Sequence, residues 1–252
     1  MGHERLGMLP KTKKWRVIVS EIGAYEAGSI TASNIAEQTL TALGSRYCEL
    51  ANDPNVRTAF SFLVEIAQSA ASADATTSVA NKSPLELVSE LARRMRATTK
   101  GSLETRELVQ RATADALVAW HRENSAEQSD LFSASAPRSR WNELGSGAGF
   151  CDMSRLYFAK LTERYLNYFL EREASAVITD FGTRERFKSR LGEHVSEVSR
   201  HSFESAKITQ SYAAGWFNKN ALGASPSDMQ TKKFLAYAFA KLREEFRREG
   251  KQ

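Results

Sequence analysis

The chain has 252 residues, 26% of them charged and 42% hydrophobic, and its formal net charge at pH 7 is +5. These values are typical of a globular protein in water, and a chain of this length can bury a core without disulfides or a structural metal. Two cysteines, no Cys/His cluster and no long apolar run argue against a structural zinc site, a signal peptide and a membrane helix. We therefore expect a cytoplasmic protein with reduced cysteines and no membrane contact.

In the first half of the chain, apolar residues recur with the period of about 3.6 residues that indicates amphipathic helices. The pattern predicts helices at residues 14–26, 32–51, 55–70, 84 to 98 or 99, and 103–122. Within the first of them, the run Val17-Ile18-Val19 would also suit a strand. Ser83 and Glu86 have the spacing of a capping box, which favours a helix start at Pro84.

Residues 123–147 interrupt this pattern with serine, glycine, proline and charged residues. We expect a linker or a long surface loop here, longer than compact domains normally contain. Three large apolar side chains lie within it, Leu131, Phe132 and Trp141. They either pin the loop onto the body of the protein or dock a partner chain. The glycines at 145–149 lack the lysine of a phosphate-binding loop and are expected to form a flexible hinge.

Three helices are predicted in the second half, at residues 152–174, at 183–220 and from about 228 onward. The first is apolar over much more than one stripe, so we expect it to be the central buried helix. The second is long enough that a bend is expected near Ser211 or Gly215. The last carries a narrow apolar seam suited to helix packing, formed by Leu235, Phe239, Leu242 and Phe246.

These elements predict an all-α fold, a helical bundle of about eight helices. The loop divides the sequence into an N-terminal helical subdomain, 1–122, and a C-terminal helical subdomain, 148–252. This division would also suit two sub-bundles joined by a long loop. No internal repeat is visible.

One predicted helix face carries two histidines and a glutamate, His194, Glu197 and His201, which are weak candidates for a metal or acid/base site. The histidines would lie about 10 Å apart along the helix axis, because each residue rises 1.5 Å. The order His-x-x-Glu is also the reverse of the Glu-x-x-His motif of di-iron bundles. We therefore interpret this face as polar surface with local ion pairs, and expect no metal and no cofactor.

Two basic clusters lie at predicted helix ends. The first lies at a C-terminal end, where cations complement the helix dipole, and consists of Arg93, Arg94 and Arg96. The second lies at an N-terminal end and consists of Arg184, Arg186, Lys188 and Arg190. Cations are unfavourable at an N-terminal end by up to about 1 kcal/mol, so both clusters, and the second above all, are candidates for contact with phosphate or an acidic partner. Sequence motifs of known nucleic-acid-binding modules are absent.

An aromatic group within residues 211–220 has two interpretations. Tyr212, Trp216 and Phe217 stand beside amides and small residues. They either pack in the core near the end of the bundle or form a docking surface, since Trp and Tyr anchors dominate protein interfaces.

These observations favour a non-catalytic interaction or adaptor subunit of a larger cytoplasmic assembly, with other protein subunits as partners. A prokaryotic defence system would be one such setting, although no residue argues for it. The alternatives are a nucleic-acid-associated subunit that uses the basic helix ends, and a helical metalloenzyme centred on His194. Homo-oligomer formation is compatible with all three.

Overall fold

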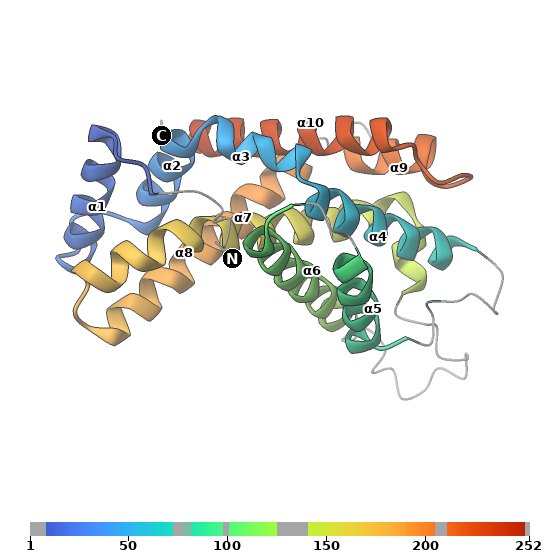
Figure 1. Ribbon diagram of the computed structural model, residues 1–252, viewed down its shortest axis with the longest axis horizontal. Helices are drawn as coiled ribbons and strands as arrows, with labels where there is room; N and C mark the ends of the chain where they lie inside the picture. The colour runs from blue at the N-terminus through green and yellow to red at the C-terminus, as the bar shows by residue number, and fades with distance from the viewer. Residues whose placement is uncertain are drawn as a thin grey trace.

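Figure 1 shows the computed structural model of the protein, which describes residues 9–72, 79, 82–97, 101–124, 141–204 and 211–249. Within these residues there are ten α-helices and no strand, so the predicted all-α class is confirmed, with ten helices in place of about eight. The helices are α1 (Lys13–Glu26), α2 (Ala32–Leu43), α3 (Ser45–Glu49), α4 (Pro54–Ala71), α5 (Pro84–Ala97), α6 (Leu103–Glu123), α7 (Gly147–Val177), α8 (Phe181–Glu204), α9 (Tyr212–Asn220) and α10 (Asp228–Glu249). Two 3-10 helices, η1 (Leu50–Asn52) and η4 (Asn142–Gly145), lie between them.

The helix count differs because two predicted helices are each divided. Gly44 separates α2 from α3 with a φ of +41°, in the left-handed region that glycine adopts without a steric penalty. The predicted helix at 183–220 is found as α8 and α9. Ser211, one of the two positions where a bend was expected, is the N-cap of α9 and accepts a hydrogen bond from the N–H of Ala213 at 3.3 Å. The alternative strand at 17–19 lies inside α1.

Side-chain caps fix the helix starts that the sequence indicated. Asp53 accepts a hydrogen bond from the N–H of Asn55 at 2.7 Å, directly before Pro54 at the first position of α4. At the start of α5 both hydrogen bonds of the predicted capping box are present. The N–H of Ser83 donates to the carboxylate of Glu86 at 2.7 Å, and the N–H of Glu86 donates to the hydroxyl of Ser83 at 3.3 Å.

The central helix is α7, as predicted, and α1, α6, α8 and α9 all pack against it. Its buried side chains meet those of α4, α9 and α10 in an aromatic cluster of Phe60, Phe150, Phe158, Trp216 and Phe234. The rings of Phe60 and Phe234 stack with centroids 4.9 Å apart. Side chains from before residue 123 and after residue 147 belong to one hydrophobic core.

The seam of α10 is buried. Leu235, Phe239, Leu242 and Phe246 are each at most 1% exposed. They pack against α2, α3, α4 and α8, and α10 extends along α2 and α3 at one edge of the molecule (Figure 1). The seam is therefore part of the core of this chain and is not an interface left for another protein.

The segment that precedes α7 is closely packed. Trp141 is 2% exposed, and its indole N–H donates to the carbonyl oxygen of Lys82 at 2.8 Å. Gly149 lies in the first turn of α7, where a Cβ atom would overlap the backbone carbonyl of Glu143. The expectation of a flexible hinge at 145–149 is therefore wrong, because the glycine serves a close backbone contact. Leu131 and Phe132 lie outside the described residues.

Candidate functional site

A long groove follows α7, with α6 on one side and α8 on the other. It consists of three adjoining hollows with volumes of about 640, 460 and 150 Å³, and Lys188 lines all three. We call this surface the interhelical groove. Because its walls come from three helices that pack around the core, its shape is set by the fold.

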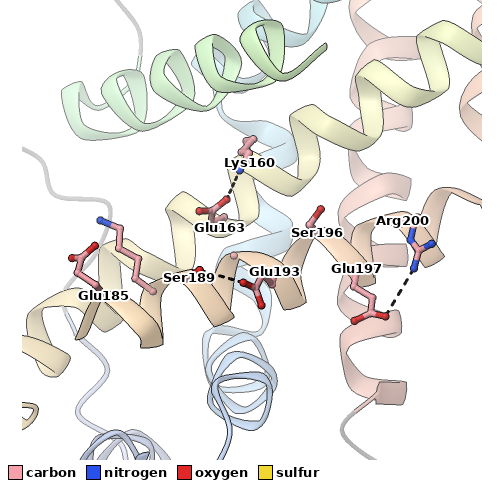
Figure 2. Close-up of a pocket in the computed structure, with 10 residues that line it drawn as sticks. Lys160, Glu163, Glu185, Ser189, Glu193, Ser196, Glu197 and Arg200 are labelled. Atoms are coloured by element: carbon pink, nitrogen blue, oxygen red, sulfur yellow. Dashed lines mark hydrogen bonds and ion pairs between the residues drawn. The ribbon is translucent and has the colours of Figure 1, made fainter. Parts of the chain in front are cut away.

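Figure 2 shows the largest hollow, between α7 and α8. The α8 residues that line it are Glu185, Lys188, Ser189, Gly192, Glu193, Ser196, Glu197 and Arg200. Their spacing of three or four residues places them on one face of the helix. Facing them on α7, Lys160 donates to Glu163 at 2.9 Å.

The second hollow lies between α6 and α7 and is also lined by paired charges. Arg111 is 2.5 Å from Glu107 on α6, an i, i+4 pair. Arg164 of α7 reaches across to Asp115 of α6, with a hydrogen bond of 2.7 Å from its Nε. These pairs lie at the surface, so they contribute little to folding and can be exchanged for contacts to another molecule.

The groove is acidic although the chain is basic. Within the described residues its lining contains eight carboxylates and six basic side chains. The carboxylates are Glu104, Glu107, Asp115, Glu163, Glu171, Glu185, Glu193 and Glu197, and the basic residues are Arg111, Lys160, Arg164, Arg184, Lys188 and Arg200. The excess of carboxylates favours the approach of a positively charged surface.

Gly192 keeps the middle of the groove open, a feature that periodicity did not reveal. A Cβ atom at this position would be 2.9 Å from a carboxylate oxygen of Glu163. Glycine in the interior of a helix is unfavourable by about 1 kcal/mol relative to alanine, so its presence in α8 requires a reason. The room that it leaves for Glu163 is such a reason.

The basic cluster at the start of α8 does not form a single patch. Lys188 is 3.9 Å from Glu171, and Arg190 is 2.9 Å from Glu193. Arg186 donates to the hydroxyl of Thr183 at 2.6 Å and is 3.8 Å from Asp180. The guanidinium of Arg184 lies over the ring of Phe181.

The helix dipole at this end is complemented by Asp180. Its carboxylate accepts hydrogen bonds from the hydroxyl and the backbone N–H of Thr183, which lower the pKa of Asp180 below its usual value. The negative charge of Asp180 therefore offsets the unfavourable effect of the basic residues on the helix dipole at the start of α8. No external anion is required to stabilise this helix end.

The other basic cluster lies on α5, outside the groove. Arg94 pairs with Glu65 and Glu90 and covers the ring of Phe62 at 4.9 Å. Arg93 and Arg96 are exposed near the end of the helix. The structure thus places one of these three arginines in an internal network and leaves two at the surface.

The weak metal candidates have different neighbours. His194 Nε2 is 3.7 Å from Glu37, and His201 Nδ1 is 3.5 Å from Glu249. Glu197 lines the interhelical groove, 3.9 Å from Arg200. In the part of the chain that the structure describes, no three His, Cys, Asp or Glu side chains are grouped so that they could hold a metal ion.

Glu37, which sequence reasoning missed, is the buried partner of His194. It lies on α2 three positions before the buried Leu40, at the edge of the apolar face of this helix, and is 8% exposed. Burial, with a smaller effect from Glu249, raises the pKa of Glu37 to about 7. Burial also lowers the pKa of His194. Glu37 of α2, His194 of α8 and Glu249 of α10 are therefore electrostatic neighbours. The sequence signal for this site was a glutamate at the edge of the apolar face of a predicted helix.

The aromatic residues of α9 belong largely to the core. Phe217 is fully buried and stacks on Phe150 with ring centroids 4.6 Å apart. Trp216 is partly buried against Phe234, at 4.7 Å. Tyr212 is also partly buried. Of the two interpretations of these residues, core packing accounts for what the structure shows.

No protein-family model matches the sequence, and no curated protein or solved structure is significantly similar to it. In the described ranges, none of the helices combines the length and the apolar character needed to cross a lipid bilayer. A function must therefore be argued from the groove and from the surroundings of Glu37.

Proposed function

We propose that the protein is a non-catalytic helical interaction subunit that holds a positively charged segment of another protein in the interhelical groove. The observation that supports this most directly is the acidic groove in a chain whose net charge is +5. Charge complementarity of this kind steers association and fixes orientation. An adaptor within a larger cytoplasmic assembly is the setting that we infer for it.

The ion pairs that line the groove can be exchanged for ion pairs with a bound protein. Lys160 and Glu163 lie 2.9 Å apart at the rim, and neither is fully buried. A lysine or arginine from a partner can replace Lys160 beside Glu163, and Lys160 then remains in water. Since both states keep the carboxylate paired, little desolvation energy is lost on binding.

A protein partner fits this surface better than a nucleic acid does. A phosphate backbone in the groove would meet more carboxylates than cations, and several of the cations already have carboxylate neighbours. Nucleic-acid binding depends on an excess of cations along the contact. The test below therefore includes a DNA probe, so that it can also detect the alternative function of a nucleic-acid-associated subunit.

The lining of the groove also supports a non-catalytic role. Among its described residues there is no histidine and no cysteine, the side chains that most readily act as a base or a nucleophile near neutral pH. Its carboxylates pair with basic side chains, either within one helix, as Glu107 does with Arg111, or between helices, as Asp115 does with Arg164.

The test uses fluorescence anisotropy with three labelled probes: an amphipathic lysine-rich peptide of about five helical turns, a glutamate-rich peptide of equal length, and a DNA duplex. We expect the lysine-rich peptide to bind, and to bind less tightly as salt increases. The double variant Glu185→Lys with Glu197→Lys reverses two exposed charges of the groove. It should weaken binding about tenfold, a change of about 1.4 kcal/mol.

The matched control is Glu49→Lys with Glu143→Lys, which changes the net charge equally at exposed positions of α3 and η4. It should leave binding nearly unchanged. The proposal is overturned if both double variants weaken binding equally, or if the duplex or the glutamate-rich peptide binds more tightly than the lysine-rich peptide.

A further inference from the structure

A second concave site, away from the interhelical groove, surrounds Glu37. Within the described residues, Glu37 is the only aspartate, glutamate, lysine, arginine or histidine that is buried. It lines a pocket of about 370 Å³ between α1, α2 and α10, which we call the Glu37 pocket. This pocket and the groove have no lining residue in common.

The carboxylate of Glu37 has no strong partner within the described chain. The nearest basic group is the His194 imidazole, whose Nε2 is 3.7 Å from Oε1, beyond hydrogen-bond distance. That nitrogen is itself buried without a hydrogen-bond partner. Glu249 approaches from α10 and adds a like charge, which disfavours ionisation of Glu37 further. A carboxylate with little access to water recovers its lost solvation from a hydrogen-bond donor, and best from a cation.

Three apolar side chains line one part of the pocket, and Lys14, Gln38, Thr41 and Arg247 line the remainder around Glu37. The apolar side chains are Val17 and Ile18 of α1 and Phe246 of α10; Val17 is 51% exposed, and the other two are each 1% exposed. A pocket that combines apolar side chains with a few placed polar groups is the usual form of a small-ligand site. Such a pocket suits a ligand with a short hydrocarbon stem and one charged end.

We infer that the Glu37 pocket binds a primary alkylammonium group, with Glu37 as its counter-ion and with Val17, Ile18 and Phe246 around the alkyl stem. The two cations at the rim do not occupy this position. Arg247 pairs with Glu244 at 2.7 Å, and Lys14 is exposed. The ligand is either a free amine or the side chain of a lysine, and the two share this chemistry.

The affinity of the Glu37 pocket for an alkylammonium group should increase with pH. The ammonium pairs with the ionised form of Glu37, so affinity increases as pH rises from 5.5 to 8, through the Glu37 pKa of about 7. The other charged or titratable groups that face the site are Lys14 of α1, His194 of α8, and Arg247 and Glu249 of α10. Burial lowers the pKa of His194, so this side chain is neutral at pH 8 and does not compete as a cation.

The test is a titration followed by amide NMR shifts at pH 8, with n-pentylamine hydrochloride, sodium pentanoate and Nα-acetyl-lysine amide as separate probes. We expect saturable shifts in α1, α2 and the end of α10 with pentylamine, and none with pentanoate. Saturation by acetyl-lysine amide as well would identify a lysine side chain as a suitable ligand. Saturation by pentylamine alone would identify a free amine, and either result supports the inference.

Glu37→Gln should weaken pentylamine binding at least about tenfold, about 1.4 kcal/mol, while Glu49→Gln, the same change at an exposed position, should not. The inference is overturned if no probe saturates, if pentanoate binds in preference to pentylamine, or if Glu37→Gln binds pentylamine as tightly as the native chain. Since the double variant Glu185→Lys with Glu197→Lys should retain pentylamine binding, failure here is distinguishable from failure of the proposed groove function.

Discussion

Replacing Glu37 by glutamine should stabilise the protein at alkaline pH and leave its stability unchanged at acidic pH. Glutamine has nearly the same shape as glutamate but cannot ionise, so the variant removes only the unfavourable burial of a charge. Glu37 is suited to this change because it is 8% exposed and has no hydrogen-bonding partner in the described chain that the substitution would break.

The size of the effect follows from the two pKa values of Glu37. The folded protein raises this pKa from 4.5 to about 7. A raised pKa means that the folded state prefers the protonated form, so the stability contributed by this group is complete below pH 4.5 and is lost as pH rises to 7. The difference of about 2.5 pKa units corresponds to roughly 3 kcal/mol, at 1.36 kcal/mol per unit. Glu37→Gln should therefore gain about 3 kcal/mol at pH 8, about 1 kcal/mol near pH 5.5, and almost nothing at pH 4.5.

The assay is urea unfolding followed by circular dichroism at pH 4.5, 5.5, 7 and 8, in which a shift of the midpoint at constant slope reports the change in unfolding free energy. In the native chain His194 has the opposite effect on the pH dependence of stability. Because its pKa is lowered, the folded state loses stability as pH falls below 6.5. This effect is common to both proteins and largely cancels in the difference. The exposed control Glu49→Gln should stay within about 0.5 kcal/mol of the native protein. Equal stabilisation at pH 4.5 and pH 8, or none at pH 8, would refute the reasoning.

Three further substitutions test the packing by the same urea assay. Gly149→Ala should destabilise the protein by about 2–3 kcal/mol, because the added methyl overlaps the carbonyl of Glu143; a neutral result would contradict the close contact. Gly192→Ala should stabilise it by about 0.5–1 kcal/mol, since the nearest atoms are at the flexible end of the partly exposed Glu163 side chain; a loss of stability would show that this side chain cannot move. Trp141→Phe should lose about 1 kcal/mol through the missing hydrogen bond to Lys82, and should leave peptide binding to the groove unchanged. Weaker binding without a loss of stability would instead assign Trp141 to partner docking.

The fold class was predictable because helix formation depends on residue patterns that are local in the sequence. The apolar stripe of α4, the capping box before α5 and the seam of α10 each depend on residues a few positions apart. The helix count was not predictable, because Gly44 is compatible with a helix interior as well as with a break. Tertiary packing selects the break by holding this glycine at a φ of +41°.

The candidate sites were less predictable than the fold, since they depend on contacts between distant residues. Glu37 and His194 are separated by 157 positions and meet only because α2 packs on α8. The same limit applies to Arg164 and Asp115, which pair across α6 and α7. His194 and His201 each have a carboxylate neighbour, but those carboxylates come from α2 and α10 and not from Glu197.

The basic run at the start of α8 shows how linear clustering misleads when the chain is helical. Arg184, Arg186, Lys188 and Arg190 are spaced by two residues. Each residue turns the helix by about 100°, so neighbours in this run point about 200° apart, whereas alternate members point within about 40° of each other. The structure follows this geometry, because Arg184 and Lys188 line the interhelical groove and the other two do not. A run with this spacing therefore divides its charge between two faces of a helix, and cannot present four cations to one phosphate backbone.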